Sequence, residues 1–556
     1  MYLRKSLSAG LLATLAASAV ACSEKGGHGV AAVSPPEATA AATSDPAPAR
    51  ATAEAKASAA PPVASATAVA SASASAAPVA PIAEAPKPPP SGARIYSKGR
   101  FAWIHSAPGE HKGWIGYLGL GGSVALKGGS VEKARVAANG GGCEGWYAIE
   151  PVGFMCTDDS ATIDPNDPVV VALAKDPPKT DSPFPYEYGE STGAPRYPHL
   201  PSPEEQKGKE WDLAAHMDAI AKAKSGGEVD KSLEGIDLSP SGVEAPTLTP
   251  VSPLVREARD RIALGSTVAW TRSFDFGGRT FLMGHDQAII PKDRVKPYPK
   301  PMFHGVELGS GVDLPLAFFR KKPRPKYTRE ADGSFKPKGD ETFALHSYVG
   351  LTGKKETIEV PAPTGKKGAV EKETYLETKE PGVWVLEKDA AVCEKTEPPT
   401  ILTLVKGGKK SWVDVSVLGG TFVAYEGDKP VYATLISPGR GGIPFPGKDP
   451  ISTASTPLGT FRVDGKFVTA SMVSSSDSNL VHTEVQYIQN FHGAHALHGA
   501  YWHEMWGLPK SGGCVNLAPI DAKKMFEWSE PKLPEGWYGM RSTPEAGAAT
   551  VVVVRR

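Results

Sequence analysis

The apolar segments of this chain are short, and clusters of glycine or proline separate one from the next. Residues 114–118, 146–149 and 383–386 are apolar runs of strand length that such turn-forming residues bound. The 59 glycines and 52 prolines among 556 residues make up roughly a fifth of the chain, against about an eighth in an average protein. Long helices rarely form across so many interruptions, and a chain of this length needs several hydrophobic cores. The sequence therefore predicts a mostly β, multi-domain protein.

The first 22 residues are typical of an export signal. Arg4 and Lys5 precede a short apolar run, small residues follow at positions 19–21, and Cys22 comes directly after them. This order resembles the lipobox of bacterial lipoproteins, although position 19 holds alanine where leucine is usual. We expect an exported protein, in the periplasm or at the outer membrane, that a lipid on Cys22 attaches to the membrane. An ordinary secretory signal with an incidental cysteine is the alternative.

The rest of the chain divides by composition into a tether and several folded regions. Residues 23–92 consist almost wholly of alanine, serine, proline, threonine and valine, which cannot bury a core, so we expect a flexible tether. Residues 93–200 contain short apolar runs, among them 169–172, that predict strands and a small β module weakly resembling bacterial SH3-type modules. We expect a helix and a linker over residues 201–252, a second β-rich and SH3-like module over 253–400, and the last domain over 401–556.

One clear helix signal begins at Ser202. The sequence Ser-Pro-Glu-Glu is a capping box with proline at the first helical position. Apolar residues then recur at helical spacing as far as residue 224, and we expect this stripe to pack on a neighbouring domain. The stripe consists of Trp211, Ala214, Ala215, Met217 and Ile220.

The five cysteines fall into different predicted roles. Cys143 and Cys156 flank a run that is typical of a hairpin, and in an oxidising compartment they could form a disulfide worth about 3 kcal/mol. Two buried free thiols are the alternative. Cys22 would carry lipid, Cys514 would carry chemistry, and Cys393 has no obvious partner in the sequence.

His498 and Cys514 stand 16 positions apart, and each lies beside a glycine. A cysteine is a good nucleophile for acyl transfer only as the thiolate, and a nearby imidazole can accept its proton. Glycine beside the cysteine lets a carbonyl group approach the backbone, and it lets N–H groups point at a developing oxyanion. The pair predicts an active site in the last domain.

Three motifs of residues 401–556 resemble the L,D-transpeptidase (YkuD-type) catalytic domain. They are Thr-Pro-Leu-Gly-Thr-Phe at 456–461, Ala-Leu-His-Gly at 496–499 with Tyr-Trp-His at 501–503, and Ser-Gly-Gly-Cys-Val-Asn at 511–516. The last is similar to the family's signature of serine or threonine followed by His-Gly-Cys, with Gly512 in the place of the histidine. The resemblance implies a lipoprotein of a bacterial cell envelope whose catalytic fold is a mostly β sandwich with few helices.

The same resemblance implies a reaction on peptidoglycan stem peptides. Cys514, as the thiolate, attacks the carbonyl carbon of the third residue of a tetrapeptide stem, D-alanine leaves, and an amine or water resolves the thioester. His498 moves the proton, and the backbone N–H groups of Gly513 and Cys514 hold the oxyanion. A backbone carbonyl near Gly499 orients the imidazole. The expected substrate-binding residues are Tyr487, Gly499, Trp502, Ser511 and Asn516, and core packing is the alternative for Tyr487 and Trp502.

Other classes of function fit the sequence less well. The residues around His498 that could bind a metal have no zinc-like spacing, so we expect neither a metal nor another cofactor; they are His492, His495, His503 and Glu504. Equal numbers of basic and acidic residues, 61 of each, give no electrostatic reason to bind nucleic acid. A papain-like protease is disfavoured because the histidine precedes the cysteine. An L,D-carboxypeptidase and a wall-binding lipoprotein with a degenerate catalytic domain are the alternatives, and no protein partner can be named.

Overall fold

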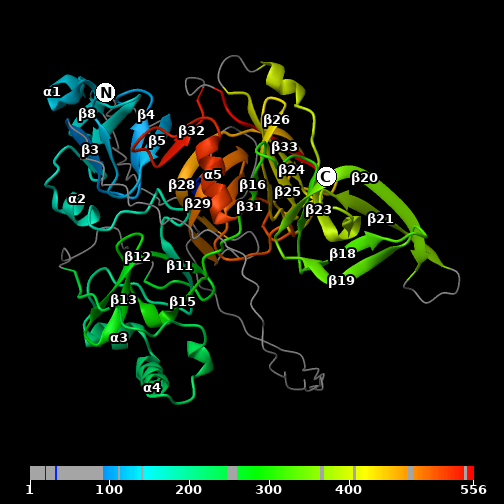
Figure 1. The fold of residues 1–556 in the computed structure, drawn as a ribbon. Helices are drawn as coiled ribbons and strands as arrows, with labels where there is room; N and C mark the ends of the chain where they lie inside the picture. Colours follow the sequence, from blue (N-terminus) through cyan, green and yellow to red (C-terminus); the bar gives the residue numbers. More distant parts are fainter. Residues whose placement is uncertain are drawn as a thin grey trace, which may run out of the picture. The chain divides into compact units, whose positions relative to one another are not determined.

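The computed structural model describes most of the chain beyond residue 91, together with the backbone of two short strands, β1 (Ala19–Val20) and β2 (Ala32–Val33) (Figure 1). The described residues are 92–109, 113–138, 142–246, 260–362, 369–404, 409–473, 480–543 and 548–556. The protein is mostly β and has several sheets, as the sequence predicts. Cys22 and almost all of the predicted signal and tether lie outside the described residues. In the described part, no helix is long and apolar enough to cross a membrane.

The last domain is a sandwich of two sheets. One sheet has the order β16-β26-β25-β24-β33-β27, and the other ends in the order β31-β30-β29-β28. Because side chains alternate along a strand, each sheet turns one apolar face to the core between them. The strands of the first sheet are β16 (Val306–Glu307), β24 (Ser411–Ser416), β25 (Thr421–Glu426), β26 (Lys429–Leu435), β27 (Gly459–Arg462) and β33 (Val551–Arg555). Those of the second are β28 (Gly465–Val473), β29 (Val481–His492), β30 (His495–Gly499) and β31 (Val515–Leu517).

Helix α5 (Pro519–Trp528) follows β31 directly and lies against β29 and β30 (Figure 1). Proline at its first turn fits the unpaired N–H positions of a helix start. Met525 and Phe526 bury their side chains in the core of the sandwich. The helix therefore supports, from the core side, the strands that carry the predicted pair of residues.

Some of the strands of residues 94–162 continue the second sheet of the sandwich, and the others form a sheet of their own. β5 pairs with β32 (Gly539–Arg541), and from there the order runs β4-β9-β8-β7. These strands are β4 (Ala102–His105), β5 (Trp114–Leu118), β7 (Arg135–Val136), β8 (Gly145–Ala148) and β9 (Phe154–Thr157). A separate three-stranded sheet contains β3 (Arg94–Ser97), β6 (Ser123–Ala125) and β10 (Ala161–Thr162), and the short helix α1 (Val131–Ala134) precedes β7. Cys143 and Cys156 form a disulfide between the segment before β8 and β9.

The run 169–172 is a helix, and its prediction as a strand is wrong. Helix α2 (Pro168–Leu173) begins with proline, and the side chain of Asp167 accepts a hydrogen bond from the N–H of Val169. A capped start with proline outweighs the β propensity of three valines in a row.

A five-stranded sheet in the order β14-β13-β12-β11-β15 joins residues on both sides of the predicted boundaries at 200 and 253. β11 pairs with β12 and also with β15, so residues 187–297 share one sheet. These two boundaries are therefore corrected, because strand pairing over a long insertion leaves no sign in the local pattern. The strands are β11 (Glu187–Ser191), β12 (Thr267–Phe276), β13 (Arg279–Gly284), β14 (Ile289–Pro291) and β15 (Val295–Pro297).

The predicted helix at 202–224 is two helices, α3 (Pro203–Lys209) and α4 (Leu213–Lys224). Ser202 and Glu205 form the capping box as predicted. Trp211 lies in the break between the helices and is 90% exposed, so the predicted apolar stripe is wrong at that position. α4 buries Ile220 on its inner face instead, beside a histidine.

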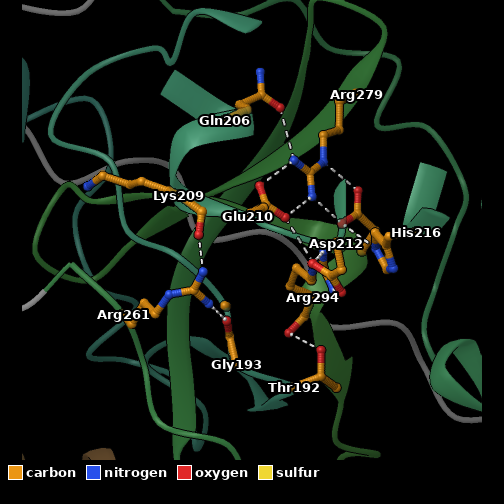
Figure 2. A network of polar contacts seen from close by, with 12 residues as sticks. Thr192, Gly193, Gln206, Lys209, Glu210, Asp212, His216, Arg261, Arg279 and Arg294 are labelled. Atoms are coloured by element: carbon orange, nitrogen blue, oxygen red, sulfur yellow. Dashed lines mark hydrogen bonds and ion pairs between the residues drawn. The ribbon is translucent and has the colours of Figure 1, made fainter. Parts of the chain in front are cut away.

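A buried ion network ties the two helices to the five-stranded sheet. Arg279 donates to both carboxylate oxygens of Glu210, at 2.7 and 2.9 Å (Figure 2). It also donates to Asp293 at 2.7 Å. Arg294 donates to Glu210 at 2.9 Å and to Asp212 at 2.7 Å. Glu210 stands in the break after α3, so the break is where the chain turns a carboxylate inward. Each of these charges has a partner of opposite sign inside the network. We therefore interpret the network as structural: it holds the two helices against the sheet.

A seven-stranded sheet in the order β19-β18-β22-β21-β20-β17-β23 occupies much of the predicted second module. Its long strands are largely exposed and carry many ion pairs on their surface, which is typical of a solvated ribbon. The strands are β17 (Leu316–Phe319), β18 (Arg324–Arg329), β19 (Phe335–Phe343), β20 (Tyr348–Pro361), β21 (Val370–Thr378), β22 (Trp384–Leu386) and β23 (Ala390–Cys393).

Candidate active site

Two parallel strands bring the predicted pair to one face of the sheet. β30 and β31 pair in the register Leu497↔Val515 and His498↔Asn516. Cys514 directly precedes β31, and residues two apart on a strand point to the same face. The thiol of Cys514 and the imidazole of His498 therefore face the same side of the sheet.

Hydrogen bonds fix the tautomer of His498. Its Nδ1 lies 2.9 Å from the carbonyl oxygen of Gly499, and because a carbonyl only accepts, Nδ1 carries the proton. The amide nitrogen of Asn516 donates to Nε2 at 3.0 Å. The amide oxygen of Asn516 accepts from Nε2 of His503 at 3.1 Å, and Nδ1 of His503 accepts from the N–H of Met505 at 3.2 Å. We call this chain from Met505 through His503 and Asn516 to His498 the imidazole relay.

The relay places Asn516 and Gly499 as supports of the imidazole. Asn516 is buried, and both ends of its amide bond to histidines, so the structure places it on His498 and a neighbouring loop instead of at the expected substrate contact. The carbonyl of Gly499 orients the ring, as the resemblance implies.

Burial keeps the imidazoles of this region neutral. His498 is 3% exposed, and desolvation lowers its pKa to about 4, against an opposing effect of the Gly499 carbonyl. Burial also lowers the pKa values of His503 and His482 to about 4. These imidazoles lie near enough to disfavour a positive charge on His498 further. A neutral imidazole is the form that can accept a proton.

Cys514 is nearly buried, with 9% of its surface exposed. Its Sγ lies 3.7 Å from the carbonyl oxygen of Ala494, to which the thiol can donate. Ala496, Val485 and Trp502 belong to the same apolar cluster as Cys514. Because the thiolate is the form that attacks, a group that accepts the thiol proton is needed here.

The loop of residues 511–513 is held by its own serine. Oγ of Ser511 donates to the carbonyl oxygen of Cys514 and accepts from the N–H of Gly513 at 3.1 Å. The Gly513 amide, expected to hold an oxyanion, is thus used inside the loop, and Ser511, expected to contact substrate, is buried. A serine hydroxyl readily reaches the amide two residues on, which explains the contact within the loop.

Gly513 is required by space as well as by conformation. Its φ is 134°, in the region that favours glycine, and an added Cβ would lie 3.1 Å from both Nε2 of His495 and the carbonyl oxygen of Ser455. Thr456, which follows Ser455, accepts a hydrogen bond from the N–H of Gly439 at 2.9 Å. Gly439 in turn forms a β-bridge with Ser511. The turn at 456–461 therefore supports the loop of the nucleophile.

Tyr487 lies in the core of the sandwich, and its prediction as a groove wall is wrong. Its hydroxyl donates to the carbonyl oxygens of Thr180, at 3.0 Å, and Ser182. The positive φ of Tyr487, 54°, interrupts the regular alternation of β29, so counting along the strand does not give its direction. Trp502, in contrast, is partly buried beside the cluster of Cys514, and its ring stacks on His482 with centroids 4.3 Å apart.

Sequence reasoning missed two histidines of the site. His503 appears in a motif but has no assigned role there, and His482 is not singled out at all. His482 reaches the site because β28 and β29 pair in the register Met472↔His482 and because Trp502 covers its ring. The only local signal is the apolar alternation of β29, which does not distinguish a buried polar position.

Comparison with known proteins agrees with this geometry. Residues 410–553 match the family model of YkuD, the L,D-transpeptidase catalytic domain. This segment carries a YkuD catalytic domain. The matched residues include Cys514 and the residues of the imidazole relay. None of the curated proteins compared with the chain is similar to it.

Several solved structures are similar to parts of the chain. The L,D-transpeptidase of Stackebrandtia nassauensis is 24% identical over 27% of this chain and 58% of its own, with a TM-score of 0.18. A cysteine-to-serine variant of the Enterococcus faecium enzyme is 19% identical over 30% of this chain and 55% of its own, with a TM-score of 0.20. An L,D-transpeptidase of Mycobacterium smegmatis is 15% identical over 42% of this chain and 77% of its own, with a TM-score of 0.20. The chain thus spans little more than half the length of the first two, and scores this low add nothing to the family match.

Proposed function

We propose that the protein is a peptidoglycan L,D-transpeptidase in which Cys514 is the nucleophile and His498 accepts its proton. The observation that carries the proposal is the placement of a thiol and a neutral, oriented imidazole on one face of paired strands. The YkuD match over the same residues supports a tetrapeptide stem of peptidoglycan as the acyl donor.

The reaction begins with proton transfer from Sγ of Cys514 to Nε2 of His498. Because the amide nitrogen of Asn516 donates to Nε2 in this structure, the amide must first move away from Nε2 so that this atom can accept the thiol proton. The thiolate then adds to the carbonyl carbon of the third stem residue, and the bond to D-alanine breaks. The imidazolium returns its proton to the leaving amine. An acceptor amine then attacks the thioester, releases the thiolate and completes a cross-link.

The N-terminal features suggest where the reaction takes place. We propose that the export signal places the protein in the periplasm or at the outer membrane and that Cys22 carries a lipid. Residues 23–92 would then act as a tether that lets the folded part reach the wall. Labelling of cells with a fatty-acid probe tests this part, since Cys22→Ala should abolish the label while leaving the chain exported.

Mass spectrometry of reaction products tests the activity. The purified protein is incubated with disaccharide-tetrapeptide, with Cys514→Ala as the blank. Cross-linked dimers that have lost one D-alanine would support transpeptidation, and tripeptide alone would indicate that water is the acceptor. If the wild-type protein and Cys514→Ala both leave the substrate unchanged, the proposal fails and a wall-binding role gains weight.

A further inference from the structure

Arg320 leaves the seven-stranded sheet at the end of β17 and inserts its guanidinium between two segments of the last domain. Nη1 donates to the carbonyl oxygen of Gly419 at 2.8 Å and to that of Gly507 at 2.7 Å. The carbonyl oxygen of Leu418 lies 3.5 Å from the same atom. Gly419 belongs to the turn between β24 and β25, and Gly507 belongs to the segment that joins His498 to Cys514.

Among the described residues, the hydrogen-bond acceptors around the Arg320 guanidinium are backbone carbonyl oxygens. Burial lowers the pKa of Arg320, and the nearby Arg324 lowers it further. A half-buried guanidinium without a carboxylate is costly unless its donors are well placed on acceptors. The short contacts to Gly419 and Gly507 meet this condition, so the guanidinium fixes the distance between the two carbonyls.

The segment around Gly507 leads directly to the imidazole relay. The N–H of Gly507 donates to the carbonyl oxygen of Ile436 at 2.9 Å, so this residue is held from both sides. Two residues earlier, the carbonyl oxygen of Met505 accepts from Oγ of Ser437 at 2.7 Å. The N–H of Met505 is the first donor of the relay and sets the ring of His503.

Packing against the same segment comes from beyond the last domain as well. Trp506 is fully buried between Met505 and Gly507, and its ring stacks with that of Phe303, with centroids 6.2 Å apart. The loop around Gly507 is therefore held at two places. Phe303, which precedes β17, packs on Trp506, and Arg320, at the end of β17, bonds to Gly507.

We propose that Arg320 is a positioning residue for the acyl transfer, which holds the loop at Gly507 so that Met505, His503 and Asn516 present His498 correctly. The seven-stranded sheet then contributes to catalysis by supplying Arg320, and its function is not limited to binding the cell wall. This inference rests on the proposed function for the acyl transfer itself, whereas the effect of Arg320 on the reactivity of Cys514 can be measured without it.

Two measurements on the full chain test whether Arg320 positions the site. The first is the steady-state rate on disaccharide-tetrapeptide for wild type, Arg320→Met, Arg320→Lys and a control. The control is Lys322→Met, which changes an exposed lysine two residues further along the chain. We expect Arg320→Met to lower kcat about tenfold and to change KM less than about twofold, because a misplaced proton acceptor affects the transition state more than binding. Arg320→Lys should recover most of the rate, since an ammonium can donate to the same carbonyls.

The second measurement does not need the substrate. It follows the pH dependence of iodoacetamide alkylation at Cys514 by peptide mass spectrometry. Arg320→Met should alkylate several-fold more slowly near neutral pH and shift the profile, while Lys322→Met should follow wild type. Wild-type kcat and alkylation profiles in Arg320→Met would overturn the inference. An Arg320→Lys variant as slow as Arg320→Met would also overturn the inference. If Arg320→Met does not fold, the comparison of Arg320→Lys with wild type decides whether the inference stands. An inactive wild type with the expected alkylation differences would refute the proposed function and leave the role of Arg320 standing.

Discussion

The amide nitrogen of Asn516 donates to Nε2 of His498 at 3.0 Å and so covers the atom that a proton acceptor must use. Nδ1 of the same ring donates to the carbonyl oxygen of Gly499, and His503 holds the other end of the Asn516 amide. The resting imidazole is therefore fully bonded and neutral, and the proton transfer has to be coupled to a movement of one amide. Substitutions of the asparagine and of the histidine can test this coupling separately.

Asn516→Leu should keep the fold and lose activity. The variant frees Nε2 but removes the group that orients the ring and can accept from the imidazolium, so we expect kcat to fall about 10- to 100-fold. Asn516→Asp is the informative counterpart. A carboxylate beside Nε2 favours the charged ring, so the pKa of His498 should rise from about 4 toward its ordinary value. NMR titration of the imidazole checks this, and an unshifted titration in Asn516→Asp would speak against the contact.

The neutral histidines should make the protein sensitive to acid. His498 has a folded pKa of about 4, below its unfolded value, so between these values the unfolded state binds more protons. The free energy of unfolding should therefore fall as the pH drops from about 6.5 to about 4, by up to about 3 kcal/mol for this residue. Urea unfolding at several pH values checks it, with His498→Gln expected to show a flatter dependence. Equal slopes for the two proteins would contradict the prediction.

The sequence predicts that His498 and Cys514 lie in one site and that a helix follows the cysteine, because each depends on local order or on motif spacing. The direction of Tyr487 could not be predicted, because positive φ values at Glu484 and Tyr487 interrupt the alternation that pattern reading assumes for β29. Boundaries at 200 and 253 fail for a different reason. β11 pairs with β12 and β15, which follow it only after two helices and a long connection, and local pattern cannot show such distant pairing.

Gly513→Ala should inactivate the protein through the backbone. The new Cβ would press against Nε2 of His495 and the carbonyl oxygen of Ser455, at a φ that disfavours any side chain. Gly442→Ala is the matched control, since Gly442 also has a positive φ but open space around its Cα. We expect Gly442→Ala to cost about 1 kcal/mol and to keep activity, whereas Gly513→Ala should lose more than about 90% of the rate. Equal effects of the two variants would show that conformation alone matters.

Glu210→Gln should destabilise the region of residues 187–297. The variant leaves two buried guanidinium groups, Arg279 and Arg294, short of negative charge, and breaking a buried ion network commonly costs about 3–5 kcal/mol. Glu204→Gln, on the exposed face of α3, is the control and should change the free energy of unfolding by less than about 0.5 kcal/mol. Chemical denaturation measures the loss of free energy of unfolding, and hydrogen exchange shows which residues lose protection. Glu210→Gln as stable as wild type would mean that the network contributes nothing net.

Lys466 should make the free energy of unfolding of the sandwich depend on pH above about 7. Its buried ammonium donates to the carbonyl oxygens of Phe526 and Ser529 at the end of α5. Burial lowers the pKa of Lys466 to about 7, the ammonium of Lys532 lowers it further, and the carboxylates of Glu530 and Glu527 oppose this. Between that value and the ordinary one near 10.5 the unfolded state binds more protons, so the free energy of unfolding should rise with pH across this window.

Lys466→Met removes the titration and keeps much of the side-chain volume. The stability of wild type relative to Lys466→Met should therefore increase from about pH 7 to about pH 10, as the folded protein sheds a proton that the unfolded chain still holds. The exposed Lys429→Met is the control and should give a constant difference. Urea denaturation of the three proteins across this range checks the slope. A difference between wild type and Lys466→Met that stays level would mean that the ammonium remains charged in the folded protein, with the two carbonyls at the end of α5 compensating for its burial.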